Sequence, residues 1–377
     1  MYDIPVKGDK CMPSTDSDKS TTLTEVSLPL SFNALAIPHV GEPVSLQQKT
    51  ISSLAPDEVL VRVNYASINK MDPMLAKRNL FQLPEPYVLG FDYSGVIVKR
   101  GSEGSRGLHV GDPVLGSIGK GECYAEYVVV KGHPNKIVPR GRVPAIDAST
   151  FGTAFLTAYE SLILSGDIRR HHGKWIYIAG AGGGLGHFAV QMAKIHGLKV
   201  IGSAGKPATI DLLHRLRVDH VIDYSKQDVV EETFRLTNGR GVDVVYDSTN
   251  SASSYQQSSA VIAAGGEYIR LGTARQLQQF GLLDLSSAVE ARAAKMVIGD
   301  LARYTADPEF QNPQARASVI QGLEQAVRWT EEGKLKPEIT KIVPFDPVAL
   351  QQAFEAFTRG EINVGKVVVE VHPRRRA

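Results

Sequence analysis

Short runs in which hydrophobic and polar residues alternate fill the chain from residue 33 to about residue 150, with Gly and Pro between them. Alternation with a period of two is typical of half-buried β-strands, and residues 58–65 show it clearly. Similar short segments are residues 95–98, 112–115 and 124–130. The pattern predicts an irregular, β-rich first domain.

A different pattern begins with a helical segment at residues 149–164, which leads into a cluster of glycines. Beyond the cluster, strand-like stretches alternate with helices of about a dozen residues, an order that indicates βαβ units and a parallel sheet. Residues 266–272 and 295–298 fit two further strands. After about residue 303 come two more helices and a strand at residues 366–371, and we expect this last part to complete the first domain.

Residues 175–193 have the length of a membrane span and contain no Asp, Glu, Lys or Arg. Five glycines within them oppose one continuous helix, so a strand, a tight turn and a helix start explain them better. We therefore expect no transmembrane segment. The first 31 residues lack the apolar stretch of a signal peptide, and we expect a disordered extension there.

Composition narrows the class of partner. The 42 Lys and Arg residues and 40 Asp and Glu residues leave a net charge of +2, which gives no reason to expect a nucleic-acid partner. The two cysteines, Cys11 and Cys123, cannot form a disulfide framework or a four-thiolate zinc site. They favour a reducing compartment, and we expect a cytoplasmic protein.

The glycine cluster carries the clearest chemical signal. The apolar strand 176–179 is followed by a G-x-G-x-x-G fingerprint in which Ala takes the first position. Such glycines allow a tight turn, close approach of the backbone to a pyrophosphate, and close packing of helix on strand. The helix that follows directs free N–H groups and its positive dipole end at the phosphates. The predicted dinucleotide-binding residues are Gly180, Ala181, Gly183, Gly184, Leu185 and Gly186.

The end of the second strand indicates which dinucleotide binds. NAD sites place Asp or Glu about 20 residues after the glycines, to bind the ribose 2′-hydroxyl. Here Ser203 and Lys206 occupy that region, and the next carboxylate is Asp211. A hydroxyl and an ammonium suit a 2′-phosphate, so we predict NADPH.

With these residues identified, the chain from about residue 32 to 371 resembles the medium-chain dehydrogenase/reductase superfamily, and within it the zinc-free quinone oxidoreductase (zeta-crystallin-like) branch. The motifs that carry the resemblance are residues 69–72, 89–96, 110–114, 156–159, the glycine turn, 220–224, 241–248 and 365–369.

The resemblance implies an α/β fold with a GroES-like, β-rich catalytic domain and a doubly wound, parallel-sheet Rossmann domain that meet at a cleft. The domains would be residues 32–153 with 304–377, and residues 154–303. It also implies a homodimer formed through the edge of the Rossmann sheet, and it places Thr157 near the nicotinamide. The further cofactor residues that it implies are Tyr224, Ser248, Leu271, Gly272, Thr273 and Lys366.

Zinc-dependent members of the superfamily carry a Cys where Asn69 stands and a His where Phe91 stands. Phenylalanine cannot bind a metal, and a neutral amide is a poor zinc ligand. We therefore expect no metal. Without a Lewis acid, hydride transfer suits acceptors that stabilise negative charge themselves, such as quinones and α,β-unsaturated carbonyls.

Asn69 is the first candidate for a hydrogen-bond donor to such an acceptor, and a turn-capping role is the alternative. Asp72 either orients its neighbours or caps a helix start. Thr157 either fixes the cofactor or packs on a helix surface. The predicted pocket for a hydrophobic or planar substrate is lined by Asp72, Met74, Phe81, Phe91 and Tyr93. Tyr93 is a possible proton donor, but packing in a strand is the more ordinary role for it.

Two other functions stay open. The chain could be a 2-enoyl-thioester reductase of the fatty-acid or polyketide type, although no tyrosine follows residues 69–72 closely as a proton donor. It could also be a non-catalytic NADPH-binding protein with a structural or RNA-interacting role, a class that the near-neutral charge supports little.

Overall fold

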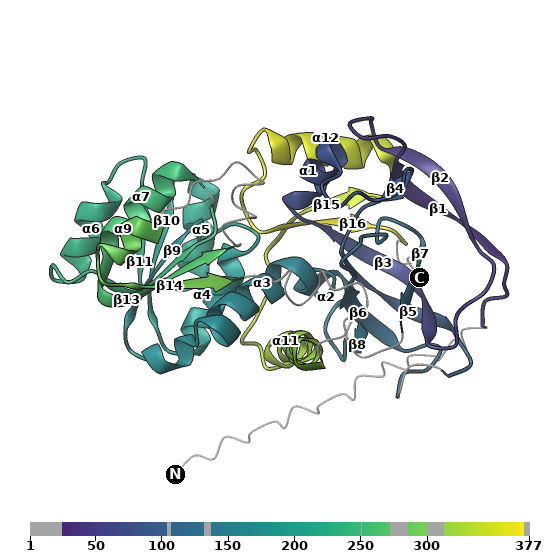
Figure 1. The fold of residues 1–377 in the computed structure, drawn as a ribbon, viewed down its shortest axis with the longest axis horizontal. Coiled ribbons are helices and arrows are strands. Elements are labelled where there is room, and N and C mark those ends of the chain that lie inside the picture. The colour runs from purple at the N-terminus through teal and green to yellow at the C-terminus, as the bar shows by residue number, and fades with distance from the viewer. Residues whose placement is uncertain are drawn as a thin grey trace, which may run out of the picture.

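The structure is a computed structural model, and it describes residues 25–103, 107–131, 137–249, 251–271, 286–299 and 313–372. The two larger sheets form two domains that lie side by side, with α3 (Leu156–Tyr159) and α11 (Pro313–Glu331) between them (Figure 1). Among the described residues, no helix is both long and apolar enough to cross a membrane.

The first domain is β-rich, as the alternating pattern predicts. A seven-stranded sheet has the order β15-β16-β3-β5-β6-β8, with β7 paired to β3, and a three-stranded sheet has the order β2-β1-β4. The strands are β1 (Leu30–Ile37), β2 (Ser45–Ile51), β3 (Glu58–Ile68), β4 (Tyr87–Val88), β5 (Asp92–Arg100), β6 (Pro113–Ser117), β7 (Tyr127–Lys131), β8 (Ile137–Pro139), β15 (Ile339–Pro344) and β16 (Lys366–Glu370).

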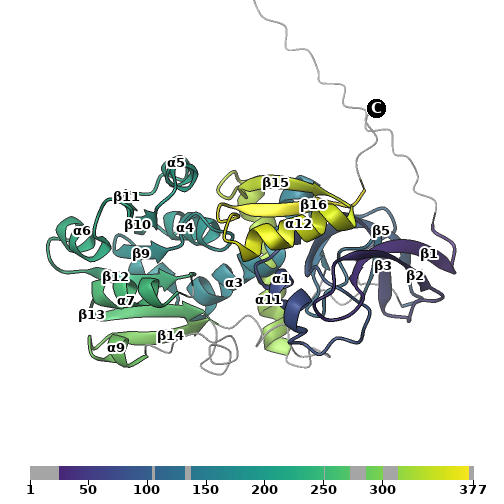
Figure 2. The ribbon, with the colours of Figure 1, turned by 90° about the horizontal axis from the view of Figure 1, so that it is seen from above.

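Both ends of the chain build this domain. β16 pairs antiparallel with β3, with Val367 opposite Ile68. α12 (Pro347–Thr358) packs on α1 (Met71–Arg78), and Figure 2 shows α12 beside β15 and β16 above α1. At the other end, β1 begins at Leu30, before the boundary at residue 31 that we expected for a disordered extension. Residues 1–24 of that extension lie outside the described residues.

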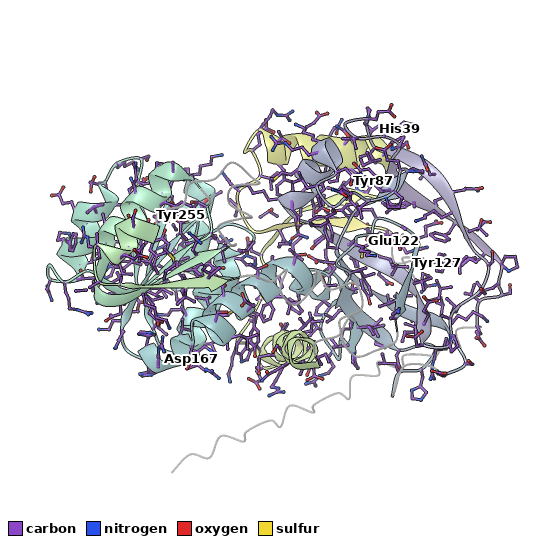
Figure 3. The ribbon with its side chains drawn as sticks, viewed as in Figure 1. His39, Tyr87, Glu122, Tyr127, Asp167 and Tyr255 are labelled. Atoms are coloured by element: carbon purple, nitrogen blue, oxygen red, sulfur yellow. The ribbon has the colours of Figure 1, made fainter. Side chains whose placement is uncertain are left out.

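Aromatic side chains close the core between the small and large sheets. Tyr127, labelled in Figure 3, lies edge-to-face against Phe32 of β1, with 5.7 Å between the ring centroids. Tyr87, also labelled there, donates its hydroxyl hydrogen bond to the carbonyl oxygens of Leu75 and Ala76 in α1.

The second domain is a parallel α/β sheet, which confirms the predicted fold class. Its six strands have the order β11-β10-β9-β12-β13-β14, and all neighbours are parallel. The strand order reverses between β9 and β12, and ligands of such sheets bind at the carboxyl ends of the strands at that point. The elements are β9 (Trp175–Ala179), α4 (Gly186–Ile195), β10 (Lys199–Ala204), α5 (Pro207–Arg215), β11 (His220–Asp223), α6 (Val229–Leu236), β12 (Val242–Asp247), α7 (Ala252–Val261), β13 (Ile262–Leu271), α9 (Ser286–Glu290) and β14 (Lys295–Gly299).

A helical segment joins the domains and is irregular. It runs through a π-helical turn, Phe151–Phe155, then α3 (Leu156–Tyr159), then a second π-helical turn, Glu160–Ser165. π-Helical turns inside helices occur often at functional sites. The remaining helices are α2 (Ala145–Ala148), a 3₁₀ turn at Ile168–His171, and α11 (Pro313–Glu331).

Phe155 is the centre of an aromatic cluster that ties the joining segment to both neighbours. Its ring centroid lies 5.5 Å from that of Phe188 on α4 and 6.3 Å from that of Trp329 on α11. It also stacks on Tyr159, 5.9 Å away. The side chain is fully buried, so this contact fixes the joining segment in place.

Phe155→Ala is expected to destabilise the fold by about 3–5 kcal/mol, because a large cavity replaces a buried ring that four elements share. Thermal unfolding followed by circular dichroism would measure the loss. Val348→Ala, on the exposed face of α12 (62% exposed), is the control and should change the midpoint little. Equal midpoints for both variants would contradict the role of the cluster.

Candidate functional site

The glycine turn between β9 and α4 has the geometry that its sequence predicts. Gly180 has a φ of +69°, in the left-handed region that favours glycine. A Cβ on Gly186 would lie 2.0 Å from the carbonyl oxygen of Gly180, so only glycine lets α4 start this close to β9. By contrast, a Cβ on Gly183 or Gly184 would meet no atom closer than 3.3 Å, so this side of the turn is open.

The first turn of α4 offers free donors at that open side. Within the described residues, the backbone N–H groups of Gly184, Leu185 and Gly186 have no hydrogen-bond acceptor. Three successive free N–H groups at the positive end of a ten-residue helix suit a diphosphate. The turn therefore fits a dinucleotide.

His187 stabilises the turn through a hydrogen bond to its backbone. It is fully buried, and its Nδ1 donates to the carbonyl oxygen of Gly183 at 2.9 Å. Burial lowers the pKa of His187 to about 4, so the ring is neutral at pH 7. His187 was not among the predicted site residues, although a histidine on the otherwise apolar face of the predicted helix was a signal for it.

The carboxyl ends of β10 and β11 bring together the residues predicted for the adenosine end. The Tyr224 ring lies over Gly205, where a Cβ would come within 2.2 Å of it. Ser203 lies at the end of β10 and is 6% exposed. Lys206 follows it, is exposed, and its Nζ lies 3.5 Å from the carbonyl oxygen of Gly360. The three residues thus lie at neighbouring strand ends of the Rossmann sheet, with Ser203 buried and Tyr224 and Lys206 exposed.

Ser248, at the end of β12, lies next to the glycine turn. Its hydroxyl donates to the carbonyl oxygen of Ala179, 2.9 Å away. Leu271 ends β13 and is buried. Gly272 and Thr273, also predicted for this site, lie outside the described residues.

The segment before β16 crosses to the glycine turn. The N–H of Gly365 donates to the carbonyl oxygen of Gly182 at 2.8 Å, and the Lys366 side chain passes within contact distance of the Gly184 position. The turn of the Rossmann domain and the last strand of the catalytic domain are thus in direct contact.

Lys366 then enters a buried network at this junction. Its Nζ donates to the Asn69 side-chain oxygen at 2.6 Å and to the Ile68 carbonyl oxygen at 3.2 Å. The Asn69 amide nitrogen donates in turn to Asp92, at 2.9 Å. Lys366 is 2% exposed and Asn69 6%. Burial lowers the pKa of Lys366, and the charges of Asp92 and Asp72 oppose that shift.

Asn69 is therefore held between an ammonium and a carboxylate. The prediction treated it as a free donor or as a turn cap, and the structure gives its side chain a third position. One amide hydrogen of Asn69 and one ammonium hydrogen of Lys366 have no acceptor among the described residues.

Asp92 is the residue that the sequence analysis missed most clearly. Besides Asn69, its carboxylate accepts hydrogen bonds from Ser67 Oγ at 3.0 Å and from both the N–H and the hydroxyl of Thr153, at 2.6 and 2.7 Å. A Cβ on Gly152 would lie 2.2 Å from it. The signal available in the sequence was an aspartate at the start of an apolar strand, because a carboxylate that is buried there must be paired.

Asp72 orients backbone on both sides of the predicted pocket. Its carboxylate accepts from the N–H of Asn69 at 2.7 Å and from the N–H of Gly90 at 3.1 Å. Burial raises the pKa of Asp72 to about 7, and the charge of Asp92 adds to the rise. Of the two predicted roles, the geometry matches the orienting one, since α1 has no side-chain cap.

The remaining predicted residues divide into two groups. Thr157, on α3, is half-buried and donates to the carbonyl oxygen of Thr153 at 2.6 Å, which leaves its oxygen lone pairs to accept. Met74 is half-buried, and Phe81 (44% exposed) lies edge-to-face on the buried Phe91, with 6.1 Å between centroids. Tyr93, however, is fully buried in the core of the catalytic domain, and burial raises its pKa well above the ordinary value. The structure thus gives Tyr93 a packing position instead of a pocket position.

Within the described ranges, no group of three or more His, Cys, Asp or Glu side chains is arranged to hold a metal ion. Asn69 and Phe91 stand at the two positions where the resemblance would place zinc ligands. An ammonium 2.6 Å from the Asn69 oxygen also opposes a divalent cation there, because like charges at short range repel.

A GroES-like domain, a Rossmann sheet and a glycine turn at their junction define a two-domain nucleotide-dependent oxidoreductase. Residues 55–160 match the alcohol dehydrogenase GroES-like domain family, and residues 184–307 match the family described as zinc-binding dehydrogenase. The chain belongs to the medium-chain dehydrogenase/reductase superfamily. Membership implies a nicotinamide cofactor, and the chain is an oxidoreductase of this superfamily.

Individual relatives extend over most of the chain. The trans-enoyl reductase pgmF of Aspergillus terreus is 27% identical over 330 residues, which are 85% of this chain and 88% of that protein. The quinone oxidoreductase of Pongo abelii is 25% identical over 313 residues, 83% of this chain and 88% of that protein. Among solved structures, the CurK enoyl reductase aligns with a TM-score of 0.75 at 24% identity, covering 90% of this chain and 99% of that one, and it shows the same fold.

Asp72→Asn is expected to remove a pH dependence of stability. A carboxyl whose pKa is about 7 when folded and near the ordinary 3.8 when unfolded binds its proton more tightly in the folded state. Its contribution to the free energy of unfolding therefore falls as the pH rises from about 4 to about 7, by at most about 1.4 kcal/mol per pH unit, and is constant above.

Urea unfolding of wild type and variant between pH 4 and 8 would measure the effect. The free energy of unfolding of the wild type minus that of the variant should fall with rising pH over that window. Asp211→Asn, at an exposed position of α5, is the control and should follow the wild-type slope. A D72N profile as steep as that of the wild type would contradict the prediction.

Proposed function

We propose that the chain is an NADPH-dependent, zinc-independent reductase of quinones or α,β-unsaturated carbonyls. The observation that carries the proposal is the Lys366–Asn69–Asp92 network beside the glycine turn, because it puts spare N–H donors where related enzymes place a metal ligand.

The cofactor residues divide by the part of the dinucleotide that they suit. The free N–H groups of Gly184 to Gly186 would hold the diphosphate, and Ser203, Lys206 and Tyr224 the adenosine end with its 2′-phosphate. Ser248, Leu271, Gly272, Thr273 and Lys366 would line the rest. Thr157 would accept a hydrogen bond from the carboxamide, since its own proton is used within the helix. When bound, NADPH supplies the hydride.

The protein has to position the acceptor and stabilise the negative charge that develops on its oxygen. The unused hydrogens of Asn69 and Lys366 are suitable donors, and the partners on their other sides hold both groups in place. Asp92 fixes the Asn69 amide and Asp72 fixes its backbone. We assign the final proton to water, because Tyr93 lies in the core.

Met74, Phe81 and Phe91 would provide the apolar surface for a flat or hydrophobic substrate. The exposed Phe81 ring, resting on the buried Phe91, is the flattest part of it. This arrangement supports a small hydrophobic or planar carbonyl or quinone substrate.

A 2-enoyl-thioester reductase is the second candidate, and similarity to the trans-enoyl reductase pgmF favours it. Both reactions deliver hydride to a double bond conjugated to a carbonyl, so the same donors would serve both. We also propose that the protein is cytoplasmic and a homodimer joined through β14, which is one of the two edge strands of the described Rossmann sheet.

Purified protein is expected to oxidise NADPH with an ortho-quinone or a short enone, followed by absorbance at 340 nm. Preincubation with a strong chelator should leave the rate unchanged. Turnover with crotonyl-CoA alone would replace the first candidate with the second. Tight NADPH binding without turnover of any acceptor would favour a non-catalytic NADPH-binding protein.

Lys206→Ala is expected to raise the KM for NADPH by about tenfold and to change that for NADH little, since one charge-assisted contact to a 2′-phosphate is lost. Lys226→Ala is the matched control, because Lys226 is exposed near the same strand ends but pairs with Asp223. Equal effects of K206A on both cofactors would remove Lys206 from the phosphate site.

A further inference from the structure

Tyr177, in the middle of β9, contacts Ser203 of the predicted 2′-phosphate site from within the core of the Rossmann domain. β9 and β10 are parallel, with Tyr177 opposite Ile201. Side chains two apart on a strand share a face, so Ile201 and Ser203 lie on the same side as Tyr177. The phenol extends past Ile201, and its oxygen lies 2.9 Å from Ser203 Oγ.

The hydrogens of this pair can be counted. Tyr177 is 1% exposed and Ser203 6%, and neither hydroxyl has another hydrogen-bond partner among the described residues. Burial keeps the phenol protonated by raising its pKa. Two O–H groups share one hydrogen bond, so one hydrogen is left over.

The surroundings decide which hydrogen that is. Tyr177 lies among the buried side chains of β10, β11, β12 and α7, and Ser203 is its one hydrogen-bonding neighbour in the described structure. The phenol therefore donates to Ser203 Oγ, since an unbonded donor in an apolar core is costly. The serine hydrogen is then the free one, at the carboxyl end of β10 where the cofactor is expected.

We propose that Tyr177 is a positioning residue for cofactor specificity, which makes Ser203 a committed hydrogen-bond donor. The inference rests on the proposed NADPH dependence. A 2′-phosphate has only acceptor oxygens and suits a serine that donates. A ribose 2′-hydroxyl also needs an acceptor for its own hydrogen, and the phenol already takes one of the two lone pairs with which Ser203 Oγ could accept it.

The neighbouring groups support this polarity. Lys206, three residues after Ser203, adds a positive charge. The Tyr224 ring covers Gly205, which lies between Ser203 and Lys206 in the chain. The nearest carboxylate on this segment, Asp211, is exposed within α5. The carboxylate opposite the end of β10 is Asp223 on β11, and it is already bonded to Ser225 and paired with Lys226. The described end of β10 itself thus offers donors to the ribose.

Tyr177→Phe tests the inference, because it keeps the buried ring and removes the O–H. The dissociation constants of NADPH and NADH are measured by quenching of protein fluorescence. The NADPH preference, taken as the ratio of the two constants, is expected to fall by about tenfold, mostly through weaker NADPH binding. Tyr246→Phe, at another fully buried tyrosine on the adjacent strand β12, should leave the ratio unchanged.

A double variant separates positioning from packing. Ser203→Ala should lower the preference by a similar factor, and adding Tyr177→Phe to it should lower the preference no further, because the phenol acts through Ser203. An unchanged ratio in Y177F, or an equal loss for both cofactors, would overturn the inference while S203A still shows the role of Ser203. A wild-type protein without preference for NADPH would instead overturn the proposed cofactor and, with it, this inference.

Discussion

The buried ammonium of Lys366 connects the C-terminal strand to the N-terminal part of the chain, next to the predicted cofactor turn. Lys366 bonds residues 68 and 69 from the opposite end of the sequence, and through Asn69 it reaches Asp92. Asp92 then binds Thr153, where the joining segment leaves for the Rossmann domain. A buried charge that loses its partner costs several kcal/mol, so each link depends on the others. The neighbouring Gly365 bond to the glycine turn places the cofactor site against this network.

The balance of charge in this network explains the unusual state of Asp72. Two buried carboxylates, Asp72 and Asp92, face a single ammonium. Asp92 collects hydroxyl and amide donors in addition, whereas Asp72 accepts two backbone N–H groups and is wholly buried. Its pKa is raised first by burial, and the negative charge of Asp92 adds to the rise. The site therefore approaches neutrality near pH 7, which suits the role proposed for its N–H donors.

Local patterns predicted the Rossmann domain and its glycine turn because backbone geometry alone fixes them. The steric limits at Gly180 and Gly186 follow from short-range packing. The spacing of hydrophobic residues, which distinguishes strands from helices, can be read directly from the sequence. The network could not be predicted in the same way, because the partner of Asn69 is Lys366, 297 residues away. Asn69 was assigned a role from its own chemistry, and Tyr93 from its position after a motif, without knowledge of what surrounds them. Tyr177 looked like one more apolar strand residue until the strand register placed its hydroxyl on Ser203.

Cofactor choice and substrate choice rest on different parts of this molecule. The proposed cofactor determinants lie at strand ends, where the register of β9, β10 and β11 positions Ser203 and the residue before Tyr224. The proposed substrate surface rests on α1 and the following residues, where Met74 is half-buried and Phe81 exposed. Phe81 belongs neither to a strand nor to the Lys366 network, whereas Tyr177 and Asp92 make buried hydrogen bonds. On the proposed assignment, the acceptor varies among relatives while the cofactor site stays the same, which agrees with the names enoyl reductase and quinone oxidoreductase among the proteins that the chain resembles.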